Sequence, residues 1–191
     1  MNDALEIRAA QQVDADSCRR VVLEAFGDQG EAILGVLGDL DGRGDLTRQL
    51  IAEVGGVVVG LVGLSRAWLD ARERLVEVLV LSPLAVTPGH ARRGIGGALV
   101  EAALASADEE GSPLVFVEGA PDFYGAHGFA PASEHGVLRP SARIPDAAAQ
   151  VALLDGHEAW MTGALVYPDC WWRRDLVGLR DPLLAELEEG S

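Results

Sequence analysis

The spacing of apolar and polar positions predicts that the chain begins with a strand followed by two helices. Residues 5–8 alternate between apolar and polar side chains, as in a half-buried strand. Apolar residues then recur at helical spacing in two segments, residues 14–26 and 31–40. Each segment would therefore bury one face and expose the other, which is typical of helices that cover a sheet.

The next part of the chain predicts antiparallel strands. Two apolar runs, residues 48–54 and 57–64, flank Gly55-Gly56, a dipeptide typical of a two-residue hairpin turn. A long strand is expected over residues 74–86, with an interruption at Pro83 because proline lacks the N–H that a paired strand uses. Taken alone, this proline fits a strand that separates from its neighbour, an edge strand or a bulge.

The second half of the chain alternates between helical and strand patterns. A helix with an apolar face is expected from residue 94 to about 107, followed by a fully apolar strand over 113–117 of the kind that is buried on both faces. The segment 130–156 has no clear period and is expected to hold a sixth strand, a loop on the substrate side and a short return. An apolar run at 164–167 predicts the last strand, and leucines at helical spacing over 175–191 predict a short amphipathic helix.

A glycine-rich turn between the long strand and the following helix is the first candidate for chemistry. A helix start carries unpaired backbone N–H groups and a partial positive charge, which together favour a bound anion. Gly94, Gly96 and Gly97 leave these amides uncovered, and Arg92 and Arg93 add positive charge where phosphate oxygens would lie. The segment therefore predicts a site for a phosphate-bearing ligand, the alternative being a turn whose glycines serve packing alone.

Two motifs identify the kind of ligand. A dinucleotide fingerprint would need a third glycine where Leu99 stands, and a P-loop would need a lysine that this turn lacks. The run Ala91–Gly96 instead resembles the acetyl-coenzyme A (acetyl-CoA) motif of the GNAT superfamily of N-acetyltransferases, with Ala91 in place of the leading Gln or Arg. Residues 121–129 are similar to the short helix of that family that carries a tyrosine, three residues and then Gly-Phe. The resemblance covers residues 4–172 and points to a small bacterial branch of predicted acetyltransferases.

The resemblance implies a fold and a cofactor site. The fold would be an α/β (α+β) acyl-CoA N-acyltransferase fold, with a mixed, mostly antiparallel sheet whose fourth and fifth strands splay apart between flanking helices. The backbone beyond Pro83 would bind the pantetheine arm of acetyl-CoA, and the glycine-rich turn would bind the pyrophosphate through its amides. The residues expected at this cofactor site are Leu84, Ala85, Val86, Ala91, Arg92, Arg93, Gly94, Ile95, Gly96 and Gly97.

The resemblance also assigns catalytic candidates. Tyr124 matches the tyrosine that acts as the general acid in similar enzymes, and a phenol with a pKa of about 10 stays protonated at neutral pH. A packing tyrosine beside Phe123 is the alternative. Glu77 and Glu118 are the two candidates for the general base, although a strand glutamate more often is solvated or ion-paired, and water can deprotonate the amine in many such enzymes.

Composition restricts the partners. The chain has 30 acidic and 15 basic residues and a formal net charge of −15, which disfavours nucleic acid. Its two cysteines and four histidines show no metal-ligand spacing, so free thiols and no metal are expected. No apolar run reaches the roughly 18 residues of a membrane helix and no export signal is visible at the start, so we expect a cytoplasmic protein without a membrane partner.

These observations predict an N-acetyltransferase domain over residues 1–175, followed by an amphipathic, partly frayed tail over 176–191. The expected reaction transfers the acetyl group of acetyl-CoA to a primary amine of a small molecule or a protein, by direct attack in a ternary complex. The alternatives are a non-catalytic acyl-CoA sensor or interaction module on the same fold, and an acyltransferase that uses a longer acyl-CoA. The protein would be a monomer or a homodimer.

Overall fold

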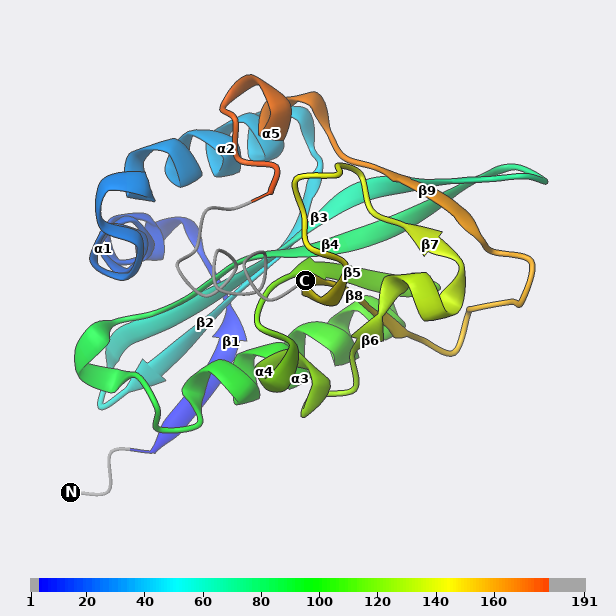
Figure 1. Cartoon of the computed structure of the whole chain (residues 1–191). Coiled ribbons are helices and arrows are strands. Elements are labelled where there is room, and N and C mark those ends of the chain that lie inside the picture. Colours follow the sequence, from blue (N-terminus) through cyan, green and yellow to red (C-terminus); the bar gives the residue numbers. More distant parts are fainter. Residues whose placement is uncertain (1–3, 179–191) are drawn as a thin grey trace. The chain divides into compact units, whose positions relative to one another are not determined.

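Two long strands, β3 (Val57–Ala71) and β4 (Leu75–Val86), organise the chain in this computed structural model, which describes residues 4–178 (Figure 1). The chain divides into two compact units, and both strands contribute to each of them. The first unit comprises residues up to 65 and residues 81–106, and the second comprises residues 66–80 and the chain from residue 107 onward.

The helices of the first unit confirm the helical patterns of the sequence. Helices α1 (Ala15–Phe26) and α2 (Gly30–Arg43) pack against each other, and each buries one apolar stripe. The buried stripes consist of Cys18, Val21 and Val22 in α1, and of Ile33, Val36, Leu37 and Leu40 in α2. Gly44 ends α2 in the left-handed conformation that glycine adopts without steric cost (φ 72°).

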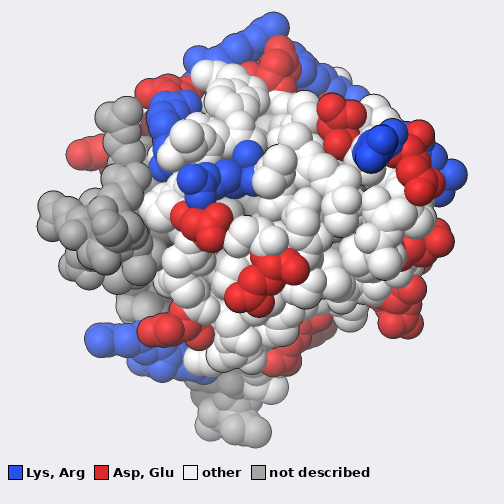
Figure 2. All heavy atoms as spheres, turned by 45° about the vertical axis from the view of Figure 1, so that its right-hand side comes forward, with Lys and Arg blue, Asp and Glu red and all other residues white. Residues whose placement is uncertain are grey.

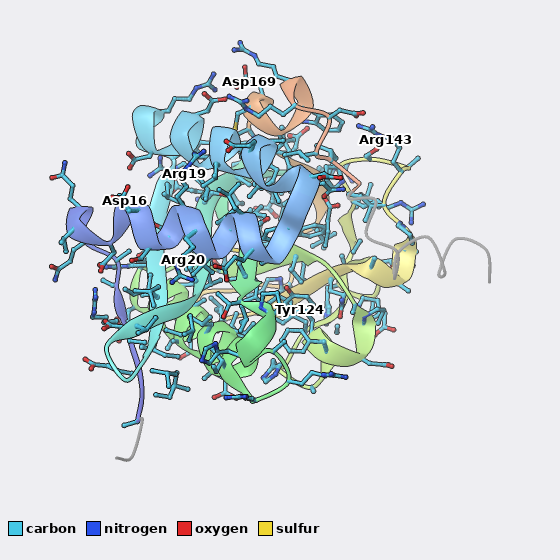
Figure 3. The ribbon with its side chains drawn as sticks, turned by 90° about the vertical axis from the view of Figure 1, so that its left-hand side faces the viewer. Asp16, Arg19, Arg20, Tyr124, Arg143 and Asp169 are labelled. Atoms are coloured by element: carbon cyan, nitrogen blue, oxygen red, sulfur yellow. The ribbon has the colours of Figure 1, made fainter. Side chains whose placement is uncertain are left out.

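The strands of the first unit form an antiparallel arrangement in the order β1 (Leu5–Ala9), β2 (Leu46–Val54), β3, with β4 beside β3. Gly55 and Gly56 both have positive φ (59° and 78°), so the predicted two-residue hairpin turn is confirmed. In Figure 1, α1 and α2 lie on one side of these strands and α3 (Ile95–Glu109) on the other. Arg20 links α1 to the sheet, because its Nη2 donates to the carbonyl oxygen of Val58 at 2.7 Å (Figure 3).

Pro83 lies inside β4, so the interruption expected there is wrong: the strand continues to Val86. Proline removes only one backbone donor and its fixed φ is compatible with extended backbone, so a strand can continue through it. The parallel pairing of β4 with β5 (Leu114–Glu118) joins Leu79 to Val115 and Val80 to Phe116.

The second unit is built on β5, whose apolar run is buried as the sequence predicts. Its sheet continues from β4 through β5 and β8 (Ala149–Leu153) to β6 (Ala130–Pro131), and β9 (Gly163–Val166) pairs with β3 and with β7 (Val137–Leu138). Two short helices complete it, α4 (Pro121–Gly125) and α5 (Asp169–Arg173). The mixed, mostly antiparallel sheet flanked by helices is therefore confirmed.

The segment after α4 differs from its expectation. The strand that directly follows has only two residues, and the longer partner of β5 is β8, which comes later in the chain. Most of the helix expected over residues 175–191 lies outside the described residues, whereas Leu176 and Val177, which precede that part, are buried in the second unit.

Candidate active site

Thr87 fixes the start of the glycine-rich turn in the first unit. It is 5% exposed, and its backbone N–H donates to the carbonyl oxygen of Val59 at 2.8 Å. Its own carbonyl oxygen accepts from the N–H of His90 at 2.9 Å, and its hydroxyl lies 3.0 Å from His90 Nδ1. One buried residue therefore ties the turn to β3 and shapes the short 3-10 helix Pro88–His90 that follows.

The backbone of the turn is shaped for an anion. Arg92 and Gly94 have positive φ (59° and 80°), and Arg93 lies between them. Successive N–H groups in such alternating conformations form a concave nest that favours negative charge. At the start of α3 the N–H of Ala98 donates to the carbonyl oxygen of Gly94 at 3.0 Å, and the amides of residues 95–97 belong to the first turn, whose N–H groups have no acceptor within the helix. Residues 91–94 are all exposed, which leaves the turn open to a ligand.

Glycines in β3 allow α3 and β4 to approach this strand closely. A Cβ atom at Gly60 would lie 3.0 Å from Leu99 Cδ1, 3.1 Å from the carbonyl oxygen of Ala85 and 3.4 Å from Ile95 Cγ2. A Cβ atom at Gly63 would lie 2.9 Å from the carbonyl oxygen of Ser82. Sequence reasoning missed both residues, although a glycine inside an apolar strand is a recognised sign of close backbone approach.

The predicted pantetheine segment belongs to the same unit as the turn. Ala85 is 2% exposed and lies against β3 at Gly60, whereas Leu84 and Val86 are half-buried. The structure thus brings all ten residues of the predicted cofactor site, 84–86 and 91–97, into the first unit.

Tyr124 lies in α4 of the second unit and is 8% exposed (Figure 3). Its ring makes edge contacts with Phe123 and Phe129, at centroid distances of 4.9 Å and 5.4 Å. Its backbone N–H donates to the carbonyl oxygen of Ala120 at 3.1 Å, and its carbonyl oxygen accepts from the N–H of Phe129 at 3.2 Å. The Tyr and Gly-Phe parts of the motif are therefore joined by a backbone hydrogen bond as well as by ring packing.

The two glutamates proposed as the base lie in different surroundings, both in the second unit. Glu77 is exposed on β4, with its carboxylate 2.9 Å from Arg66 Nε. Glu118 is half-buried at the end of β5, where its Oε2 accepts from the N–H of Gly178 at 3.0 Å and its carboxylate is hydrogen-bonded to Tyr167. Burial, together with the negative charge of Glu118, raises the pKa of Tyr167 well above its usual value.

Other features of the described chain bear on the expected partners. Cys18 and Cys170 are buried and are not linked in a disulfide, as predicted, and burial raises the pKa of Cys18 to about 11. Within residues 4–178, no cluster of three or more His, Cys, Asp or Glu side chains could hold a metal ion. Over the same residues, no helix has both the length and the apolar character needed to cross a membrane. Figure 2 shows acidic and basic side chains interspersed on one face, without an extended basic patch among them.

Comparisons with known proteins agree on one family. The family model described as "Acetyltransferase (GNAT) domain" matches residues 6–132. The uncharacterized N-acetyltransferase YjhQ of Escherichia coli strain K12 is 33% identical over 120 residues, which cover 62% of this chain and 65% of that protein, slightly less than two thirds of its length.

Solved structures are similar over a larger part of the chain. The GNAT family N-acetyltransferase YhbS from Escherichia coli, determined in complex with CoA, aligns with a TM-score of 0.78 and 26% identity, covering 88% of this chain and 92% of that one. A GNAT family acetyltransferase from Brucella melitensis, in complex with acetyl-CoA, shares the fold with a TM-score of 0.69 at 22% identity, over 88% of this chain and 99% of that one.

Proposed function

Because this chain belongs to the GNAT acetyltransferase family, we propose that it transfers the acetyl group of acetyl-CoA to a primary amine. The observation that carries the proposal is the open turn before α3, where positive φ at Arg92 and Gly94 arranges backbone amides for a phosphate ligand. The complexes of YhbS with CoA and of the Brucella protein with acetyl-CoA support the same cofactor for this chain. Its formal charge of −15 favours an acceptor that is cationic in solution, as primary amines are.

The cofactor would be held mainly by the backbone. The amides of residues 92–97 and the partial positive charge of the α3 N-terminus would bind the pyrophosphate, whereas the N–H of Ala91 already donates to the carbonyl oxygen of Pro88 at 3.4 Å. Ala91 offers no polar side chain, so Arg92 and Arg93 would supply the remaining positive charge from the exposed side of the turn. Main-chain groups of Leu84, Ala85 and Val86 would bind the pantetheine arm, in the manner of a strand added to β4.

The chemistry requires no covalent enzyme intermediate. The amine nitrogen attacks the thioester carbonyl carbon, a C–N bond forms, the C–S bond breaks, and the CoA thiolate leaves. A cationic amine first gives one proton to the base or to water, so that its nitrogen can attack. The nitrogen loses a second proton after the attack, and the departing sulfur gains one, which Tyr124 would donate as general acid. For the base we favour Glu77 over Glu118, because the carboxylate of Glu118 is already bound to the N–H of Gly178 and to Tyr167. An exposed ion pair such as that of Glu77 contributes little and is readily exchanged.

The activity is tested by following release of free CoA thiol with a panel of amines. Tyr124→Phe should lower kcat several-fold or more and leave the Kd for acetyl-CoA nearly unchanged, because it removes only the proton donor. Asp122→Asn, at an exposed position of the same helix, is the matched control and should retain full activity. Unchanged turnover of Tyr124→Phe would remove the tyrosine from the reaction.

The cofactor assignment has its own test, by titration calorimetry. Gly96→Val should weaken CoA binding more than Arg92→Ala does, because backbone amides rather than side chains would bind most of the pyrophosphate. If the protein binds CoA but releases no thiol with any amine, the proposed function would be an acyl-CoA sensor and not an enzyme. If it prefers longer acyl-CoA donors, the transferred group would be a longer acyl chain and not acetyl. If CoA stabilised the protein no more than ADP does, the pantetheine assignment would fail.

A further inference from the structure

Gly119, directly after β5, occupies a position that no larger residue can fill unless the Tyr124 ring moves. A Cβ atom there would lie 2.2 Å from Cε2 of Tyr124, 2.7 Å from its Cδ2 and 3.3 Å from its Cζ. Real Cβ atoms essentially never approach another heavy atom within 3.0 Å. Gly119 is not one of the glycines with positive φ, so space and not backbone conformation demands glycine here. The ring of the proposed general acid therefore rests directly on the backbone of residue 119.

The backbone of Gly119 is itself held on both sides of its peptide units. Its N–H donates to the carbonyl oxygen of Ala148 at 3.0 Å. Its carbonyl oxygen accepts a hydrogen bond from Gln150 Nε2 at 3.1 Å. The preceding residue is fixed as well, because the carboxylate of Glu118 accepts the N–H of Gly178. The backbone that the Tyr124 ring contacts is therefore hydrogen-bonded to Ala148 and to Gln150 of β8, and the residue before it is hydrogen-bonded to Gly178.

Gln150 is an unusual residue for its place in β8. It is 2% exposed, and the buried residues around it in the strand, Ala149, Val151 and Ala152, are apolar. Burying an amide side chain is costly unless hydrogen bonds compensate for the lost water. Its bond to Gly119 provides such compensation, which gives this buried amide a structural purpose beside the proposed acid.

Two further aromatic rings pack against the Tyr124 ring. Phe123 and Phe129 contact it edge to face, at interplanar angles of 83° and 72°. Together with the backbone of Gly119, these two rings leave the Tyr124 ring little room to tilt. Packing therefore sets the position of its hydroxyl group. Proton transfer requires such placement to within a fraction of an ångström.

We propose that Gly119 and Gln150 are positioning residues for the reaction: Gly119 provides the surface on which the Tyr124 ring rests, and Gln150 holds that surface in place. The proposal rests on the general-acid role of Tyr124 put forward above. A side chain at residue 119 would displace the ring, and none of the ten residues predicted to bind the cofactor belongs to the unit that contains residue 119. The effect should therefore fall on kcat and leave the affinity for acetyl-CoA unchanged.

A spectroscopic readout follows the ring independently of activity. The chain has two tyrosines, so labelling with 3-fluorotyrosine gives two fluorine resonances, which Tyr167→Phe assigns. Gly119→Ala should shift the Tyr124 resonance much more than that of Tyr167. Gln150→Met keeps the volume of the side chain but removes its donor, and it should shift the same resonance in the folded protein by a smaller amount. An unmoved Tyr124 resonance in both variants would overturn the proposal.

Kinetics then connect the ring to the reaction. Gly119→Ala should lower kcat about ten-fold or more, since a misplacement of 1 Å can cost two orders of magnitude. In a Tyr124→Ala background the same substitution should change kcat less than about two-fold, because no ring remains to be displaced. Additive effects, or a shifted resonance with wild-type kcat, would overturn the positioning role. Failure of the proposed function can be told apart from failure of the positioning role, because it is seen in proteins whose residues 119 and 150 are unaltered. There it appears either as absent acetyl transfer or as a Tyr124→Phe variant with unchanged activity.

Discussion

Replacing Gly60 with alanine places one methyl group beneath the first turn of α3. The new Cβ would lie 3.0 Å from Leu99 Cδ1 and 3.1 Å from the carbonyl oxygen of Ala85, distances tighter than nine in ten real Cβ contacts. The Leu99 side chain can rotate away, but the Ala85 oxygen belongs to the backbone of β4. A few tenths of an ångström of movement must therefore come from β4, from β3 or from the start of α3.

The size of the effect follows from packing. Adding a methylene to a close-packed core costs about 1–3 kcal/mol. For a chain of this length each kcal/mol lowers the Tm by roughly 2–4 °C, so we expect a fall of about 2–12 °C. The same movement would displace Ala85 and the amides of the α3 N-terminus. Loss of one hydrogen bond to a charged phosphate oxygen, at about 1.5 kcal/mol, corresponds to roughly ten-fold weaker binding of CoA.

Thermal denaturation and titration calorimetry with CoA measure the two effects on the same protein. Gly42→Ala in α2 is the matched control, because a Cβ there meets nothing within 4 Å. It should raise stability by about 0.5–1 kcal/mol, as alanine does in a helix, and leave CoA binding unchanged. A Gly60→Ala protein with wild-type Tm and wild-type CoA affinity would refute the idea that close packing of β3 against α3 and β4 shapes the cofactor site.

Three further predictions concern a loop contact and two titrating groups. Thr87→Val keeps the shape of the side chain but removes the hydroxyl that contacts His90, so CoA should bind about five-fold more weakly by calorimetry, and Thr87→Ser should restore binding. Hydrogen bonds from Arg8 lower the pKa of Asp14 to about 2. The stability that this carboxylate contributes is therefore present above pH 4 and is lost as the pH falls towards 2. Over that range the urea midpoints of wild type and Asp14→Asn should converge. Burial, with the charge of Glu118, raises the pKa of Tyr167 in the folded protein. The contribution of this tyrosine to stability is therefore complete below pH 10 and declines at higher pH, where the tyrosine of the unfolded chain ionises. Above pH 10 the urea midpoint of Tyr167→Phe should fall less steeply than that of wild type.

Local signals predicted those parts of the fold that depend on neighbouring residues alone. The helical spacing of apolar residues predicted α1 and α2 to within a few residues, and Gly55-Gly56 predicted the turn between β2 and β3. The turn before α3 was visible for the same reason, because its arginines and glycines are adjacent in the chain. Each of these features needs only one segment of sequence to be specified.

Features that depend on distant segments could not be predicted in this way. Strands β6 and β7 have two residues each, too few to show any period, and both are defined by their partners β8 and β9. Thr87 looks like an ordinary polar residue until β3 supplies the carbonyl oxygen of Val59. Gln150 likewise gains its meaning only when β8 is placed next to β5.

Residues 94 and 119 favour glycine for two physically different reasons, and one substitution at each position distinguishes these reasons. Gly94 has φ +80° and nothing within 4 Å of a Cβ, so its requirement is conformational, and asparagine tolerates that conformation. Gly119 has no such φ but meets the Tyr124 ring at 2.2 Å, so its requirement is space. Gly94→Asn should therefore keep the Tm of the ligand-free protein within about 2 °C of wild type, a change below roughly 1 kcal/mol. Gly119→Ala should lower the Tm more than Gly94→Asn does, although alanine is smaller than asparagine. The reverse order of the two Tm values would contradict both the conformational requirement at Gly94 and the steric requirement at Gly119.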